Sequence, residues 1–266
     1  MPADAADVAS PEACGGGASR GTIMTRVVFA RERMGVSEGF DLDGRDTPMG
    51  DMASCSRPDY VSPEGLRGVD NQLSQLAALL DLQTQGAVDG LVQAAVNNGQ
   101  LLMAVTLEGV DDEREDPCVD MIFQRVQGVP TVGADGMLDP WQSYDPIPDT
   151  PVTRTRARIH EGVLEAGPFE GSVAVAVLDA RFVLDLHGGR LRARLGEDGA
   201  LTGVLGGGMS VSQLSDIIGT LNIPEAFMNL ARSYIRTIAD LDRREGRCQQ
   251  FSAALSFSGR AAFVNR

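Results

Sequence analysis

The sequence predicts an α+β protein built on a mostly antiparallel β-sheet, with two helical pairs packed on that sheet. Three observations lead to this prediction. Short β-type runs separated by turn residues fill residues 153–206 and indicate a meander. Helical patterns occupy residues 70–98 and 210–241. A last apolar run at 248–258 predicts a closing strand, so the helices lie between strands along the chain.

Residues 1–20 are rich in Ala, Gly, Ser and Pro and are expected to form a disordered tether or linker. Residues 21–266 are predicted to form a single α+β domain, because a chain of this length can bury a substantial core. The first strand is predicted at 22–30. The loop-like segment 35–68 follows, and a loop of that length usually carries a function or an ion.

The elements after this loop follow from local signals. Asp70 is expected to cap a helix, and a second helix near 85–98 ends at Gly99. Apolar runs at 100–108 and 118–126 predict two strands.

Turn residues divide the meander. Gly188-Gly189 and Asp198-Gly199 predict tight hairpins, because their central positions accept positive φ. The predicted strands are approximately 153–164, 170–178, 180–187, 190–196 and 200–205.

The net charge of the chain is −14, and it is unevenly distributed. Residues 1–150 carry −16 and residues 151–266 carry +2. Such an acidic protein is compatible with cations and disfavours nucleic acid as a partner, although the charge can also serve solubility alone. No apolar run reaches the roughly 18 residues of a membrane span, and residues 1–13 lack the pattern of an intact signal peptide.

The four cysteines are widely spaced, without the C-x-x-C pairs of zinc or redox centres. Cys118 and Cys248 each open a strand-like run, so they are the disulfide candidates that would join neighbouring strands. Such a bond indicates an oxidising compartment, whereas buried free thiols in a cytosolic protein are the alternative. Cys14 precedes three glycines, as in a lipidated bacterial lipoprotein, although residues 11–13 depart from the lipobox.

The sharpest functional signal is the loop that contains Asp41, Asp43 and Asp46 around Gly44. Carboxylates at alternate positions beside a glycine turn suit a hard cation, and the predicted metal is calcium. The loop is not an EF-hand, because Met52 stands where the bidentate Glu would be. A solvated turn without an ion is the alternative. The groups that could complete a calcium shell are Asp51, Asp59, Glu64 or backbone carbonyls.

A second acidic stretch spans residues 108–116 and contains six carboxylates. Mutual repulsion favours a solvated loop, and a cation site is the less favoured alternative because no glycine turn folds these carboxylates inward.

Arginines alternate along two of the predicted strands. With a period of two, the arginines of each strand share one face of the sheet. If both strands present them on the same side, they form a basic stripe for carboxylates, phosphates or sugars; otherwise they are a solvent face paired with acids. The six residues are Arg154, Arg156, Arg158, Arg190, Arg192 and Arg194.

No catalytic motif accompanies these features. The two histidines lie in strand-like runs, and the patterns of zinc proteases, dinucleotide-binding proteins and phosphate loops are absent from the sequence. The residues therefore predict a binding or structural protein rather than an enzyme. The alternatives are a carboxylate-dependent hydrolase and a carrier that encloses a small apolar ligand.

Several short segments together resemble uncharacterised secreted or lipoprotein-like proteins of GC-rich bacteria. The resemblance covers the chain from about residue 22 onward, and it implies an extracytoplasmic location, periplasmic or at the cell surface, and a structural disulfide. It carries no known activity. The segments are residues 39–44, the Cys55 segment, and residues 62–65, 68–72 and 97–100.

Overall fold

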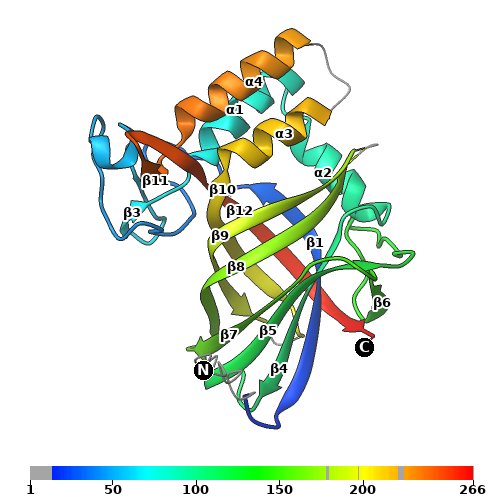
Figure 1. Ribbon diagram of the computed structural model, residues 1–266. Coiled ribbons are helices and arrows are strands. Elements are labelled where there is room, and N and C mark those ends of the chain that lie inside the picture. The colour runs from blue at the N-terminus through cyan, green and yellow to red at the C-terminus, as the bar shows by residue number, and fades with distance from the viewer. Residues whose placement is uncertain (1–13, 178–179, 197, 221–224, 266) are drawn as a thin grey trace, which may run out of the picture.

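Eight antiparallel strands form a closed barrel, which confirms the expected α+β class with a mostly antiparallel sheet. The computed structural model describes residues 14–177, 180–196, 198–220 and 225–265. Successive barrel strands are neighbours, and the pairing of β1 with β12 closes the ring (Figure 1). The barrel strands are β1 (Ala18–Phe29), β4 (Leu102–Val110), β5 (Glu115–Gln127), β7 (Val152–His160), β8 (Val163–Val177), β9 (Ala180–Leu195), β10 (Leu201–Ser210) and β12 (Arg247–Val264).

Four shorter strands lie outside the barrel ring. β6 (Gln142–Pro146) runs parallel to β12, and β11 (Leu241–Arg244) pairs antiparallel with β12. β2 (Tyr60–Val61) and β3 (Arg67–Val69) form a separate two-stranded sheet in the long loop between β1 and the first helix. The same loop contains a short 3-10 helix, Met52–Ser54.

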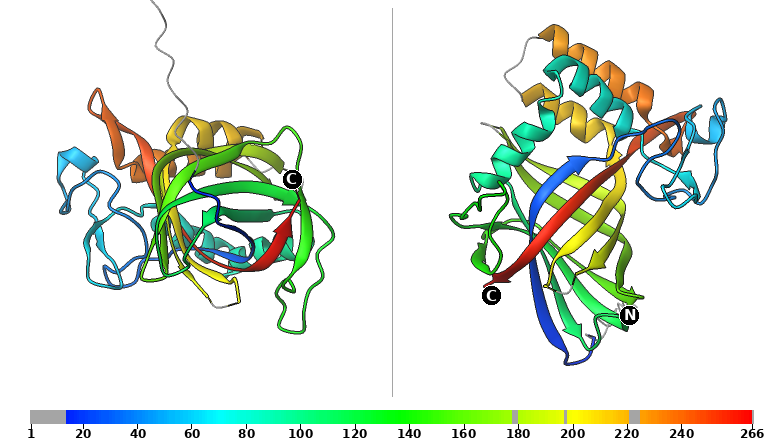
Figure 2. Two further views of the ribbon diagram at one scale, coloured as in Figure 1. Left: turned by 90° about the horizontal axis from the view of Figure 1, so that it is seen from below. Right: turned by 180° about the vertical axis from the view of Figure 1, so that it is seen from behind.

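Apolar side chains fill the barrel, which is seen end-on in the left view of Figure 2. On β5, for example, Val119, Met121 and Phe123 all belong to the buried cluster, as the period of two requires. An eight-stranded barrel is just wide enough for side chains to occupy its interior. All eight barrel strands contribute to this cluster.

The helices form two pairs in sequence, α1 (Leu73–Thr84) with α2 (Val88–Asn97) and α3 (Val211–Thr220) with α4 (Glu225–Ile238). In Figure 1, α1, α3 and α4 gather over one end of the barrel, while α2 lies near β1. Phe251 of β12 is fully buried in the cluster between these helices and the barrel. The helices therefore close this end of the barrel through a packed apolar layer.

The long loop packs against the outer face of the barrel, beside β10 and β12 (Figure 2, right). Phe40 contacts a small buried cluster that includes Val204 and Ala254. The buried Asn71 amide donates to the Ala30 carbonyl oxygen at 2.9 Å and accepts from the Ala254 N–H at 3.1 Å. These contacts attach a loop with little regular structure to a rigid strand.

The hairpin predicted at Gly188-Gly189 is wrong, because β9 continues through both residues. β9 pairs with β8 and β10 on both sides of the glycines, and the register shifts beside them. The Phe169 ring lies so close to Gly189 that a Cβ there would be 2.5 Å from it. The glycines thus accommodate a bulge and a crossing ring. The turn predicted at Asp198-Gly199 is present, with Gly199 at a φ of +75°.

The predicted pairing of Cys118 with Cys248 is also wrong. Cys118 is bonded to Cys14 and Cys248 is bonded to Cys55, with Cα–Cα distances of 5.4 Å and 6.1 Å. The physical reason is barrel topology: β5 lies between β4 and β7, whereas β12 lies between β1 and β10. The two strands are not neighbours on the ring.

Two expectations for the N-terminal region need correction. The Cys14 sulfur is occupied by its disulfide, so it does not offer the free thiol that lipidation requires. The structured chain also begins earlier than predicted, since β1 starts at Ala18 and the Cys14 N–H donates to Asp120 at 3.0 Å. Residues 1–13 of the predicted tether lie outside the described residues.

Candidate metal centre

Asp41 and Asp43 lie on a tight turn of the long loop. Asp41 Oδ1 accepts from the Gly44 N–H at 2.6 Å, and Asp43 Oδ1 accepts from the Arg45 N–H at 3.0 Å. Gly44 has a φ of +77°, which allows the chain to reverse there without steric strain. The turn therefore holds two carboxylates on adjacent parts of one loop.

Asp70 reaches the same place from the other end of the loop, directly after β3. Its backbone N–H donates to the Phe40 carbonyl at 2.9 Å, and its Oδ2 accepts from the Leu42 N–H at 2.7 Å. These bonds align the two chain segments side by side. Asp70 is only 1% exposed, and its Oδ1 is buried without a hydrogen-bond partner.

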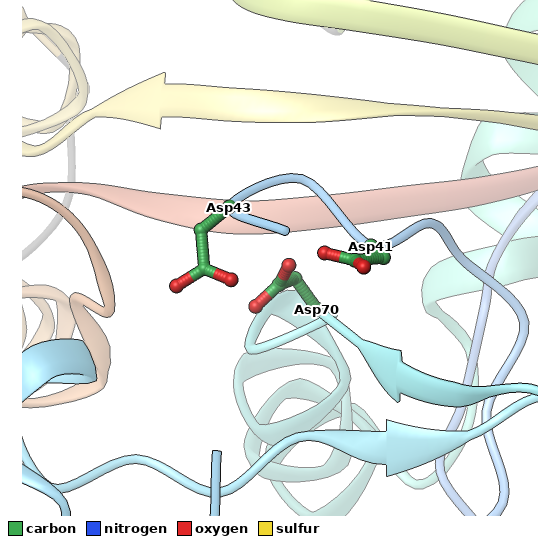
Figure 3. Close-up of side chains that lie close together, drawn as sticks. All are labelled: Asp41, Asp43 and Asp70. Carbon is green, nitrogen blue, oxygen red and sulfur yellow. The ribbon is translucent and has the colours of Figure 1, made fainter. Parts of the chain in front are cut away.

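The three carboxylates point toward one another (Figure 3), with a ligand oxygen of each within 4.8 Å of the others. Asp70 is buried, whereas Asp41 and Asp43 are both at least partly exposed, so the group connects the surface with the interior. Convergent carboxylate oxygens are the donors that hard cations prefer. The arrangement can hold a divalent cation, whose remaining ligands would be backbone carbonyls and water.

Burial sets the electrostatics of this centre. Desolvation, helped by the nearby charges of Asp240, Asp59 and Asp43, raises the pKa of Asp70 to about 9, although the hydrogen bond from the Leu42 N–H lowers it. Burial likewise raises the pKa of Asp43. A cation between these carboxylates would replace the proton as the neutralising charge.

Two more carboxyl groups lie near the centre, those of the buried Asp240 and the half-buried Asp59. Asp240 accepts from the Ser252 N–H and Oγ–H at 2.7 and 2.6 Å, and burial raises its pKa to about 7. Asp59 accepts from the Thr47 N–H at 2.6 Å, while its Oδ1 is buried without a partner. Burial also raises the pKa of Asp59.

The raised pKa values of Asp70 and Asp240 lead us to expect that stability depends on pH in metal-free buffer. Because the folded-state pKa values of Asp70 and Asp240 lie above the unfolded values, their stabilising contribution is complete below about pH 4. That contribution is lost as pH rises through about 7 for Asp240 and about 9 for Asp70. We therefore expect the free energy of unfolding to fall from mildly acidic to alkaline pH.

Denaturant unfolding at several pH values would measure this slope. The Asp240→Asn variant should show a shallower decline near neutral pH, whatever its absolute stability. A stability that stays level or rises across this range would contradict the prediction.

The structure replaces one predicted ligand. Asp46 lies outside the cluster and forms an ion pair with Arg67, with a distance of 2.6 Å from Oδ2 to Nε. Asp70 takes part instead, although it is not the helix cap predicted for it, since Gln72 occupies that position. The local sequence contains no signal for this role, because Asp70 meets the Asp41 turn only through the pairing with Phe40.

The residues predicted to complete a calcium shell have other partners. Asp51 caps the 3-10 helix by accepting from the Ala53 N–H at 2.8 Å. Asp59 Oδ2 accepts from the Thr47 N–H, and Glu64 Oε2 lies 3.7 Å from Arg192 Nη2.

The second acidic stretch forms a turn between β4 and β5. Asp116 is buried and accepts from the Asp111 and Cys118 N–H groups, while Glu113 pairs with Arg20 at 2.6 Å. Among the described residues, only Asp41, Asp43 and Asp70 form a group of three potential ligands. Asp111, Asp112 and Glu115 are exposed as expected for a solvated loop, whereas Asp116 is an exception.

The arginines of both triplets alternate with inward-facing residues, such as Ala157 on β7 and Leu191 on β9, and so share the outer face of the barrel. β8 separates the two strands. A cleft brings together four of the six arginines, Arg156, Arg158, Arg190 and Arg192.

Comparison of the chain with protein-family models, curated proteins and solved structures gives no match. Within the described part of the chain, no helix is both long enough and apolar enough to cross a membrane.

Proposed function

We propose that this is an extracytoplasmic binding or structural protein whose Asp41–Asp43–Asp70 centre binds calcium. The observation that carries the proposal is the buried Asp70 carboxyl group, which lies beside those of Asp41 and Asp43 and whose Oδ1 lacks a hydrogen-bond partner. Burial disfavours the ionised form of this carboxyl group, and a bound cation would supply the opposite charge that the ionised form needs.

Calcium suits this ligand set better than a transition metal. All three side chains offer oxygen, and calcium accepts six to eight oxygen ligands in irregular geometry. Magnesium demands a near-ideal octahedron, which a turn and a separate buried residue are less suited to supply. A calcium ion would join the Asp41 turn to Asp70 and so close the loop onto its own base.

The extracytoplasmic location is supported by the disulfides. All four cysteines are paired, and both bonds join segments far apart in the sequence, with separations of 104 and 193 residues. Disulfides of this structural kind persist in oxidising compartments and are rare in the cytosol.

The carrier alternative receives less support from the packing. The side chains beneath α4, including Ile235 and Ile238, form a packed apolar cluster with Phe251. Apolar residues likewise fill the barrel interior. For the hydrolase alternative, a cleft of about 600 Å³ is lined by Asp43, Asp240, Asp242 and Glu245 among others, but Asp240 is engaged by Ser252.

Thermal unfolding with excess EDTA and then with millimolar calcium tests the metal proposal. Calcium at about 100 times its dissociation constant should add about 2.7 kcal/mol to the free energy of unfolding. For a domain of this size, this corresponds to a rise in Tm of about 5–10 °C. The Asp70→Asn variant should show no rise. In EDTA above about pH 9, where Asp70 would ionise, it should be at least as stable as wild type because a buried charge is removed.

Asp46→Asn is the matched control. Asp46 belongs to the same loop but pairs with Arg67 outside the cluster, so this variant should keep the full calcium response. The proposal fails if wild type does not respond to calcium, or if Asp70→Asn responds as wild type does.

A further inference from the structure

The candidate metal centre lies in the wall of a cleft of about 750 Å³, between the long loop and the outer face of β7, β8 and β9. Asp41 lines this cleft together with its neighbour Phe40. Arg67 and Val69 of β3, just before Asp70 in the chain, line it as well. Pockets of this size accommodate small organic molecules. A ligand in the cleft would therefore lie against the segments that carry Asp41 and Asp70.

The three carboxylates do not complete the coordination shell of a calcium ion. One oxygen of each already accepts from a backbone N–H group within residues 42–45, at distances of 2.6, 3.0 and 2.7 Å for Asp41, Asp43 and Asp70. The oxygens left for the ion are one from each carboxylate, whereas calcium takes about six to eight oxygen ligands. Because Asp41 lines the cleft, a ligand there can supply some of the missing oxygens.

The charged side chains of the cleft already have partners. Of the five arginines that line it, four lie beside or opposite an acid. An anion would have to compete with these acids, so the wall does not favour a charged ligand. The pairs are Arg67 with Asp46, Arg158 with Glu165, Arg192 with Glu64 and, in the β5–β7 register, Arg156 with Asp120.

Paired groups of this kind still form hydrogen bonds with a neutral ligand. A guanidinium has more N–H donors than one ion pair engages, and a carboxylate accepts several hydrogen bonds. A hydroxyl group both donates and accepts, so it matches a wall that offers donors and acceptors side by side. The composition of the cleft therefore favours a ligand with several hydroxyl groups.

Arg190, the fifth arginine of the cleft, supplies an independent indication of a ligand. Its Nε is buried and has no hydrogen-bond partner among the described residues. A buried donor without a partner is destabilising, and more so when the group is charged. A hydroxyl oxygen of a ligand would accept this hydrogen bond.

The cleft also presents apolar surface on a rigid wall. Leu66 lines it and is 58% exposed, and Pro117 of β5 lines it as well. The Arg192 guanidinium lies 5.7 Å from the centre of the Phe40 ring, a cation–π contact that holds both side chains in place. Side chains that are already held lose little conformational entropy on binding. Sugar rings, which combine C–H groups with hydroxyl groups, fit such a mixed surface.

We propose that the metal centre and this cleft together form a calcium-dependent site for a saccharide. Two adjacent hydroxyl oxygens of the sugar complete the coordination of the ion beside Asp41, and the paired side chains of β7, β8 and β9 hydrogen-bond to its other hydroxyl groups. Hydroxyl oxygens are neutral ligands, like the carbonyl and water oxygens that calcium accepts. This inference rests on the calcium centre proposed above, and it adds that the ion and the sugar bind together.

An array of immobilised mono- and oligosaccharides, probed with the fluorescently labelled full chain, tests the inference. We expect at least one saccharide to bind the protein in millimolar calcium, and this binding to fall about tenfold or more in excess EDTA. Methylation of the hydroxyl groups of that saccharide should abolish binding.

The rise in Tm with calcium alone reports on the metal centre separately. If calcium raises the Tm but no saccharide on the array binds, or if saccharide binding is the same in EDTA, the inference is overturned while the metal proposal stands. If calcium does not raise the Tm, the metal proposal fails, and this inference fails with it.

Arg158→Ala separates the cleft from the ion. Arg158 is exposed and pairs with Glu165 rather than with the metal centre. This variant should keep the calcium-induced rise in Tm but bind the saccharide about tenfold more weakly. Asp70→Asn should lose both responses.

Arg154→Ala is the matched control for Arg158→Ala. Arg154 is exposed on the same face of β7 but does not line the cleft, so its loss should leave saccharide binding unchanged. If the two variants weaken saccharide binding equally, the cleft is not the site and the inference is overturned.

Discussion

Replacement of Cys55 and Cys248 by serine is expected to lower the free energy of unfolding by about 2–5 kcal/mol. The bond joins residues 193 apart, so its loss frees a very long chain segment in the unfolded state. In the native state it attaches the long loop to β12, close to the β11 hairpin. Differential scanning calorimetry should show a fall in Tm of several degrees or more.

This disulfide should also affect the metal centre. Cys55 lies in the loop that carries Asp41 and Asp43, whereas Asp70 stays attached through the Asn71 hydrogen bonds to the barrel. We expect the Cys55→Ser/Cys248→Ser variant to show a smaller calcium-induced rise in Tm. The Cys14→Ser/Cys118→Ser variant is the matched control: it loses the other disulfide, next to the β4–β5 turn, and should keep the calcium response. Equal calcium responses in both variants would contradict this coupling.

The second large effect is expected from Phe251→Ala, which should cost about 3–5 kcal/mol. Phe251 is fully buried where α1, α3 and α4 meet β12, and truncation would leave a cavity that rigid strands cannot close. Denaturant unfolding measures this cost as a shift in midpoint with an unchanged slope.

Phe263→Ala provides the control on the same strand. Phe263 is 55% exposed and contacts Trp141 at a centroid distance of 5.9 Å, so its truncation should cost about 1 kcal/mol or less. If the two variants lost equal stability, the apolar layer beneath the helices would not be the packed core described above.

Strands and helices could be predicted where the pattern of residues within the element itself indicates them. Alternating apolar residues placed most of the strands, and the helical patterns at 70–98 and 210–241 contain the two observed helix pairs. Gly188-Gly189 misled this reasoning, because a double glycine permits a turn but equally permits a bulge. The decisive contact, the Phe169 ring over Gly189, comes from the neighbouring strand.

The residues of the candidate sites also fall into two groups, those that a local sequence pattern indicates and those that only tertiary contacts bring in. Asp41 and Asp43 belong to one turn, and their spacing alone indicated that they could share a cation. Asp70 joins them through a backbone pairing with Phe40 across the whole loop, which no local pattern encodes. The alternation of the arginines is visible in the sequence, but only the tertiary structure brings Arg156, Arg158, Arg190 and Arg192 to one cleft beside the long loop.

The sequence by itself determined the class of the protein: an antiparallel sheet with helices between its strands, an acidic loop and two arginine-bearing strands. Those properties depend on residue spacing along a single element. Only the tertiary structure decided that the sheet closes through β1 and β12, that Cys14 pairs with Cys118, and that Asp70 rather than Asp46 faces Asp41. Each of these results from contacts between residues distant in the chain, whose energies depend on how all the elements pack together.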